Sequence, residues 1–164
     1  MTGSGCSPAP AWTGPTVAAR VEAVRRVGED WIVFADQGEF AADDIILAAG
    51  FGNAALASGL DLTPVRGQAS WAYGIAPVRA TSFGGYAAPL DDGILFGATH
   101  DRGDAETDLR QGDHDRNLAL LAEGLPDVAA ALAGSALKGR ASIRAATRDY
   151  LPLAGRIESG LWIL

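Results

Sequence analysis

The chain has 164 residues and a formal net charge of −7, with 48% hydrophobic and 20% charged residues. This composition is typical of a folded globular protein and excludes a disordered chain. The acidic balance opposes binding to nucleic-acid phosphates unless the cations are clustered. No apolar run approaches the roughly 20 residues of a membrane-spanning helix, and residues 1–15 lack the pattern of a secretory signal. The single cysteine, Cys6, excludes an internal disulfide, so we expect a cytoplasmic protein.

The first part of the chain predicts an irregular start followed by a small antiparallel sheet. Residues 1–15 are rich in Gly, Ser, Pro and Ala and show no periodicity, which is typical of irregular structure. From Val17 onward, apolar residues alternate loosely and are interrupted by the turn-forming residues 28–30 and 36–39. This pattern predicts an antiparallel meander.

The meander leads into a strand and a short helix. Residues 45–49 form a continuous apolar run, which predicts a strand inside a sheet that is covered on both faces. Residues 50–53 should then open a short helix over residues 54–58, which Gly59 ends. The glycines of this turn superficially match a dinucleotide-binding fingerprint, but no acidic residue ends the next strand, so a complete dinucleotide site is excluded. A purely structural turn is the alternative.

The remaining sequence predicts a mainly antiparallel domain. Strands are expected at residues 65–73, around Tyr86, at residues 93–99 and at residues 136–147. A buried strand is expected at residues 161–164. Because strands and helices do not alternate regularly, the predicted class is α+β.

Two helices and a polar loop are expected between these strands. Asp113 should cap a helix that runs to about residue 123, and Pro126 suits the first turn of a second helix. His100 and His114 lie near several aspartates in residues 101–115. Their spacing matches no metal-binding motif, so we expect a solvated loop and a helix cap, and no metal site.

Several short motifs occur in an order that characterises one family. A small-residue turn ends the segment 43–50, and residues 64–68 read Pro-Val-Arg-Gly-Gln. An aromatic strand follows at residues 85–89, an apolar strand ending in Gly-Ala-Thr at 95–99, and an arginine-containing segment at 143–152. Together these motifs resemble the FAD-dependent oxidases of the D-amino-acid oxidase and glycine oxidase family.

One subfamily resembles this sequence in more detail. Residues 97–103 with Thr107-Asp108, and residues 144–152, resemble the oxidase half of bifunctional enzymes that form 5-methylaminomethyl-2-thiouridine in tRNA. In those enzymes the oxidase half removes a carboxymethyl group from a secondary amine on the wobble uridine. The resemblance covers most of residues 17–164.

The resemblance implies a fold and a domain organisation. The expected fold is α+β, a mainly antiparallel mixed sheet flanked by helices as in the substrate domain of D-amino-acid oxidase, plus a partial FAD-binding α/β segment. We expect an irregular N-terminus at 1–15, part of the FAD-binding domain at 16–63, a substrate-binding domain at 64–153 and the start of a return into the FAD domain at 154–164.

The resemblance also implies site residues. Arg144 would bind the substrate carboxylate through its planar fork, the alternative being a structural arginine paired with Asp149 or another acid. Tyr86 would face the substrate, or else be an ordinary strand tyrosine. Arg66 and Gln68 would lie at the junction of flavin and substrate, or else be solvated. The residues implied to contact FAD are Ala48, Ala49, Gly50, Arg66, Gly67 and Gln68.

The implied function is FAD-dependent oxidation of a glycine-like secondary amine or amino acid, by hydride transfer to the flavin. The substrate would be a small amine or a modified tRNA. The family's N-terminal Gly-x-Gly-x-x-Gly loop and its final glycine-rich segment are absent from this sequence. We therefore expect a fragment whose FAD site is incomplete and which is inactive in isolation. The alternative is a non-catalytic domain, derived from such an oxidase, that binds a ligand or a protein.

Overall fold

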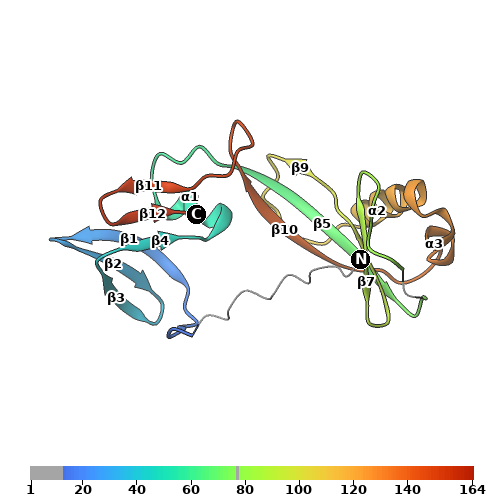
Figure 1. Cartoon of the computed structure of the whole chain (residues 1–164), viewed down its shortest axis with the longest axis horizontal. Coiled ribbons are helices and arrows are strands. Elements are labelled where there is room, and N and C mark those ends of the chain that lie inside the picture. Colours follow the sequence, from blue (N-terminus) through green and yellow to red (C-terminus); the bar gives the residue numbers. More distant parts are fainter. Residues whose placement is uncertain (1–12, 77) are drawn as a thin grey trace, which may run out of the picture. The chain divides into compact units, whose positions relative to one another are not determined.

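The computed structural model describes residues 13–76 and 78–164, which belong to two compact units, Met1–Asp43 and Asp44–Leu164 (Figure 1). The predicted irregular N-terminus lies outside the described residues as far as residue 12, and so does Cys6. The predicted domain boundaries after residues 63 and 153 remain predictions.

The first unit is the expected antiparallel meander. Its strands are β1 (Val21–Val27), β2 (Asp30–Ala35) and β3 (Gly38–Ala42), hydrogen-bonded in that order. Gly28 has a φ of 67°, a left-handed conformation that glycine adopts without steric cost, and it therefore permits the tight turn between β1 and β2. Trp31 of β2 is the buried aromatic residue of this sheet, with 4% of its surface exposed.

The second unit is built around an antiparallel sheet with the strand order β10-β5-β8-β7-β6. This arrangement confirms the strands predicted at residues 65–73, around Tyr86, at 93–99 and at 136–147. A short strand, β9, pairs with the first half of β5. The strands are β5 (Thr63–Tyr73), β6 (Thr81–Ser82), β7 (Tyr86–Leu90), β8 (Gly93–Gly97), β9 (Asp101–Arg102) and β10 (Lys138–Ala146).

Helices α2 (Gln111–Gly124) and α3 (Pro126–Ala131) belong to the same part of the chain as this sheet (Figure 1). Ile94 and Phe96 of β8 pack in one core cluster with Leu121 of α2, and all three are fully buried. Apolar residues on one face of the sheet must be shielded from water, and the contacts in this core therefore hold the helices against that face. Within the described ranges, no helix is both long and apolar enough to cross a membrane.

The predicted start of α2 was wrong by three residues. Pro126 does begin α3, as expected for a residue without a backbone N–H. Asp113, in contrast, lies inside the first turn of α2, and the N-cap position belongs to Arg110. The Asp113 side chain is unavailable for capping because it is only 4% exposed and is engaged with the sheet.

A buried ion pair joins α2 to β5. The guanidinium of Arg66, which is 0% exposed, contacts the carboxylate of Asp113. The second oxygen of that carboxylate accepts a hydrogen bond of 3.1 Å from Arg116, and Arg116 also binds Asp101 nearer the surface. Since an isolated buried charge is very costly, each member of the pair requires the other.

Neutral hydrogen bonds extend this junction along β5. The Gln68 side chain donates to the carbonyl of Arg110 and accepts from its backbone N–H, each at 2.9 Å. Asn117 donates to the Gln68 carbonyl at 2.8 Å and to the Ser70 hydroxyl at 2.9 Å. His114 contacts the same hydroxyl at 2.8 Å. The helix is therefore fixed to the sheet by polar contacts as well as by its apolar face.

A smaller sheet completes the second unit. β11 (Gly155–Glu158) pairs with β12 (Leu161–Ile163), which runs parallel to β4 (Ile45–Leu47). A 3-10 turn, Gly50–Gly52, and a short helix, α1 (Asn53–Leu56), follow β4. The strand predicted at 161–164 is confirmed for Leu161–Ile163, but it is buried on one face only: Leu161 and Ile163 are 3% and 6% exposed, whereas Trp162 is 39% exposed.

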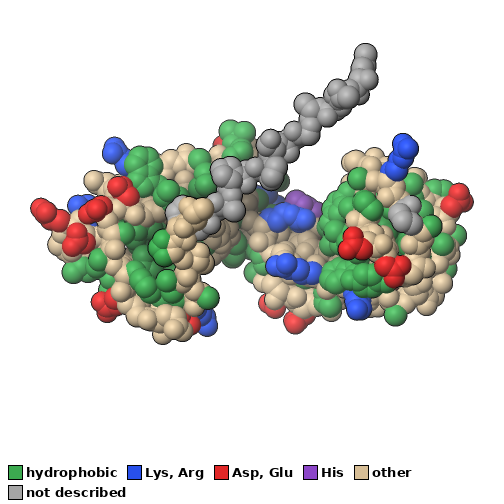
Figure 2. Space-filling view, turned by 60° about the horizontal axis from the view of Figure 1, so that its bottom comes forward, with side chains coloured by type: hydrophobic (Ala, Val, Ile, Leu, Met, Phe, Trp, Pro, Cys, Tyr) green, Lys and Arg blue, Asp and Glu red, His purple; other side chains and the backbone are tan. Residues whose placement is uncertain are grey.

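The expectation that the strand at residues 45–49 is covered on both faces was wrong. Ile45 and Leu47 are buried, whereas Ile46 between them is 66% exposed. β4 is the last strand on its side of the described sheet, order β11-β12-β4. Exposed apolar side chains among charged ones are also visible in the space-filling view (Figure 2).

We expect Asp113→Ala to lower the free energy of unfolding by about 3–5 kcal/mol, because it leaves the Arg66 charge buried without its partner. Asp101→Ala is the matched control. It removes a carboxylate whose pair with Arg116 is partly solvated, and it should cost about 0–1 kcal/mol. Urea unfolding of the three proteins measures both values, and equal losses for the two variants would contradict the assigned role of the buried pair.

Candidate functional site

The alternation of β5 divides its side chains between two faces of the sheet. Arg66, Gln68 and Ser70 are buried and bonded to α2 or to the loop before it. Gly67 and Ala69 point the other way, because successive residues of a strand face opposite sides. On that second face they line a pocket of about 290 Å³.

This pocket brings together residues from four strands. Arg144 of β10 and Tyr86 of β7, both predicted from the sequence as substrate-side residues, line it with Gly67 of β5. Tyr86 is 37% exposed, so its ring is accessible at the surface of the sheet. The other lining residues are Ala69, Trp71, Leu95, Ala98, Arg140 and Ser142.

The strand register gives this pocket a floor of small residues. Tyr86 pairs with Gly97, Gly97 with Ala69, and Ala69 with Arg140. This row of four positions therefore has large side chains at its two ends and almost none between them. In the adjacent row Gly67 pairs with Ser142. A flat group could approach the backbone closely over such a floor.

Gly67 provides the space in which the Arg144 side chain lies. A Cβ built at position 67 would be 2.2 Å from Nη1 of Arg144 and 2.9 Å from its Cζ. Such separations are far inside van der Waals contact, so only glycine permits this position of the guanidinium. Position 67 therefore requires glycine because of the Arg144 side chain, and not because of a turn in the backbone.

The alternative of a structural Arg144 paired with Asp149 is not what the structure shows. Asp149 accepts a hydrogen bond of 3.1 Å from the backbone N–H of Leu151. That bond is the main cause that holds the pKa of Asp149 below its usual value, and a hydrogen bond from the Thr147 hydroxyl contributes less. Arg144 itself forms no ion pair with any residue in 13–76 or 78–164.

The four central strands carry cations and no carboxylates, although the chain as a whole is acidic. Strands β5, β7, β8 and β10 contain no Asp or Glu, although the chain has 20 acidic residues. Lys138, Arg140 and Arg144 share the pocket face of β10, since they are separated by even numbers of residues. These cations can bind an anion without competition from carboxylates on their own strand or on the other three central strands.

The side chains of Arg66 and Gln68 lie elsewhere than the sequence suggested. The alternative that they are solvated is wrong, since both are 0% exposed. Their polar groups are directed toward α2, on the face opposite the pocket. The backbone at Gly67 remains open to the pocket. A contact of Arg66 or Gln68 with a cofactor remains a prediction.

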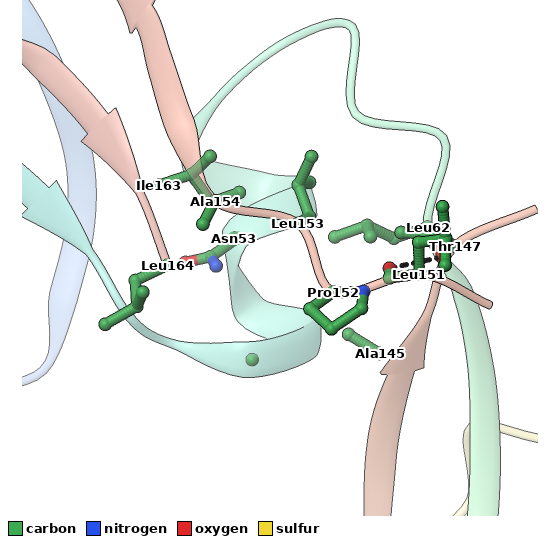
Figure 3. A pocket seen from close by; sticks show the side chains of 11 residues that line it. Asn53, Leu62, Ala145, Thr147, Leu151, Pro152, Leu153, Ala154, Ile163 and Leu164 are labelled. Carbon is green, nitrogen blue, oxygen red and sulfur yellow. Dashed lines mark hydrogen bonds between the residues drawn. The ribbon is translucent and has the colours of Figure 1, made fainter. Parts of the chain in front are cut away.

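A second pocket, of about 450 Å³, lies at the carboxyl ends of the parallel strands β4 and β12. Figure 3 shows Asn53 and Ile163 on one side of it, and Ala145 and Pro152 on the other. Ligands of α/β sheets commonly bind at this end of parallel strands. The two other predicted contacts, Ala48 and Ala49, lie in the loop that leaves β4 toward this pocket.

The turn after β4 suits close contact with a cofactor. Gly50, which lines this second pocket, has a φ of 56°, and a Cβ added there would meet no atom within 4 Å. The Asn53 side chain accepts a 3.0 Å hydrogen bond from the Ala49 N–H and so fixes the turn. The pocket is mainly apolar and lined by no Lys or Arg, so it fits a ring or a polyol part of FAD but offers no cation to its diphosphate.

The two histidines do not form a metal site within the described part of the chain. No group of three metal-binding side chains is present there. His114 is 6% exposed and contacts the Ser70 hydroxyl. It is therefore a core residue and not part of the solvated loop that the sequence suggested.

Arg140 was not among the site residues expected from the sequence. Arg140 lies four residues before Arg144 on β10, and both residues line the pocket. The signal was present in the sequence, because even spacing on a predicted strand places two side chains on one face. Ser142, two residues before Arg144, follows from the same spacing, whereas Trp71 could have been assigned to the pocket only from the strand pairing.

Comparison with known proteins places these residues in a family context. The family model "FAD dependent oxidoreductase" matches residues 16–164. The tRNA 5-methylaminomethyl-2-thiouridine biosynthesis bifunctional protein MnmC of Caulobacter vibrioides is 54% identical over 94% of this chain. The corresponding protein of Caulobacter sp. (strain K31) is 44% identical, also over 94% of the chain. This chain spans about a quarter of the length of these relatives, 26% and 27%.

Solved structures give the same fold. Glycine oxidase from Geobacillus kaustophilus superposes with a TM-score of 0.75 and 26% identity, covering 88% of this chain and 41% of that one. Glycine oxidase from Bacillus cereus superposes with a TM-score of 0.71 at 18% identity, covering 88% and 43%. The expected α+β fold, with its mainly antiparallel sheet, is confirmed by these similarities.

We expect Gly67→Ala to weaken carboxylate binding in the pocket while leaving the fold intact. The new methyl group displaces the flexible end of Arg144, which costs about one charge-assisted hydrogen bond, or roughly 1.5–3 kcal/mol. This corresponds to a loss of about tenfold or more in affinity. Titration with acetate, followed by NMR of the arginine side-chain N–H groups, measures the change.

Gly155→Ala is the control for this substitution, because a Cβ at position 155 meets no atom within 4 Å. Both variants should unfold within about 1 kcal/mol of the unmodified chain. Unchanged acetate binding in Gly67→Ala would show that the space over Gly67 does not determine the position of the Arg144 guanidinium.

Proposed function

We propose, because this chain belongs to the FAD-dependent oxidoreductase family, that its central sheet binds the carboxylate group of a substrate amine. The carbon between that carboxylate and the amine nitrogen is the one that is oxidised. One observation carries the proposal. The guanidinium of Arg144 lies over Gly67, in a pocket that Tyr86 also lines, on strands that contain no acidic residue. An unpaired arginine in such a place suits an anionic substrate group.

The proposed work of these residues is to position the substrate. Arg144 binds the carboxylate through two parallel hydrogen bonds, which fixes the orientation of the α-carbon as well as its place. Tyr86 supplies a wall and a phenolic hydroxyl on the opposite side of the small-residue floor. FAD, when bound, supplies the acceptor for the hydride that leaves the α-carbon. Water then hydrolyses the resulting imine to an amine and an oxo acid.

The cofactor would be held in part by the turn after β4. Ala48, Ala49 and Gly50 present small side chains and open backbone at the carboxyl end of a parallel strand, and these features support close approach of FAD. Gly67 would contact it from the sheet. Arg66 and Gln68 support this region indirectly, since they fix β5 to α2.

The proposed substrate is a secondary amine bearing a carboxymethyl group, in particular the carboxymethylaminomethyl group of a tRNA wobble uridine. The relatives named for 5-methylaminomethyl-2-thiouridine biosynthesis in tRNA support this choice. The similarity to glycine oxidase supports a glycine-like reacting group. A cytoplasmic location, where tRNA is found, belongs to the same proposal.

The second candidate function is a non-catalytic domain that binds a ligand or a protein. It uses the same arginine as an anchor but requires no flavin chemistry. Oxidation and binding are separated by substitutions of Arg144, because an anchor affects affinity alone whereas a positioning residue for the reaction also affects turnover.

In the flavoprotein that contains this chain, we expect Arg144→Ala to lower kcat/KM for the carboxymethyl amine by at least about 100-fold. The variant loses two charge-assisted hydrogen bonds, each worth roughly 1.5 kcal/mol or more. Arg144→Lys should recover only part of the loss, because an ammonium lacks the planar fork. Flavin absorbance in single-turnover mixing measures reduction, and the bound flavin content confirms that the cofactor site is intact.

Arg148→Ala is the matched control, since it removes an exposed arginine four residues along the chain that forms no ion pair within the described ranges. Its kcat/KM should remain within about twofold of the unmodified value. Unchanged flavin reduction in Arg144→Ala would remove this residue from the reaction, and undetectable reduction in every protein would favour the binding domain.

A further inference from the structure

Arg140 is a second free guanidinium in the same pocket as Arg144. It is exposed and lines the pocket from the same face of β10. Within residues 13–76 and 78–164 it takes part in no ion pair. Because an arginine with a nearby carboxylate would pair with it, the acid-free strands leave Arg140 available to an outside anion.

The pocket offers two guanidinium groups, whereas a carboxymethyl amine has a single carboxylate. Four residues along an antiparallel strand separate their Cα atoms by about 13 Å. A carboxymethyl amine held by its carboxylate at Arg144 would extend over only a few bonds. With that carboxylate bound by Arg144, it would have no second anion for Arg140, whereas a larger substrate with a second anionic group could contact both residues.

The space between the arginines suits a flat group. Arg140 lies at the end of the row that continues through Ala69 and Gly97 to Tyr86. The small side chains in the middle of this row allow a planar ring to lie close to the sheet, and Tyr86 offers it an aromatic face. Aromatic stacking beside cations is the usual means of binding single-stranded nucleic acid.

The geometry points to Arg140 as the residue that binds a backbone phosphate of the polynucleotide carrying the amine, and thereby as a determinant of specificity for a nucleotide-linked substrate over a free amino acid. This inference rests on the proposed function. It also reconciles a polyanionic substrate with a chain of net charge −7, because the cations are concentrated on one face of β10.

The test compares three substrates in the flavin-loaded protein. They are a single-stranded RNA oligonucleotide with one carboxymethylaminomethyl uridine, free N-methylglycine, and iminodiacetate, a small amine with two carboxylates. Arg140→Ala should lower kcat/KM for the RNA by about tenfold or more and change the values for both small amines by less than twofold. Arg144→Ala should lower all three, and this result tests the proposed function separately.

A binding measurement provides a second readout that does not depend on turnover. Fluorescence anisotropy of the labelled RNA at several salt concentrations gives the slope of log K against log salt. Removal of one phosphate contact should reduce this slope by about 0.7 for single-stranded RNA. Arg26→Ala, which removes an exposed arginine from β1, is the control for net charge and should leave the slope unchanged.

Three outcomes would overturn the inference. Equal losses for RNA and N-methylglycine in Arg140→Ala would indicate a general role in the reaction. A loss for iminodiacetate similar to that for RNA would assign the second anion as a carboxylate. The same change of salt slope in Arg26→Ala and Arg140→Ala would attribute the effect to total charge and not to a contact.

Discussion

The buried ion pair between Arg66 and Asp113 is the interaction on which the rest of the second unit depends. It fixes α2 against one face of β5, and the alternation of that strand then decides what the other face presents. With Arg66 directed toward the helix, Gly67 must face the pocket, where it leaves space for Arg144. A structural contact on one side of the sheet thus positions a recognition group on the other.

Much of this architecture could be predicted from the sequence, because hydrophobic alternation and turn residues define strands directly. The meander and the strands of the central sheet follow from such patterns. The exposure of Ile46 could not be predicted, since a short apolar run does not reveal whether a strand lies inside a sheet or at its side. The first turn of α2 was misplaced because Asp113 resembles a cap in sequence but bonds to a residue 47 positions away.

The candidate site shows the same division between local and long-range information. Arg144 and Tyr86 were predicted from short motifs, and they line one pocket. The face toward which Arg66 points, and the space that Gly67 leaves for Arg144, depend on which strands pair. Strand pairing cannot be predicted from the residues next to these positions in the sequence. The face on which Arg140 lies could be predicted from its spacing to Arg144. Its availability for a ligand could not, because that depends on the absence of acidic residues from the neighbouring strands, which only the strand pairing shows.

The absence of carboxylates from the four central strands also has a practical consequence for solution chemistry. An arginine fork without an internal partner does not distinguish strongly between a substrate carboxylate and the anions of common buffers. Phosphate, citrate and sulfate would therefore compete for the central sheet and raise the apparent KM without affecting the fold. The choice of buffer thus becomes part of the chemistry of this surface, because the local field of the sheet, and not the negative charge of the whole chain, governs which ions gather there.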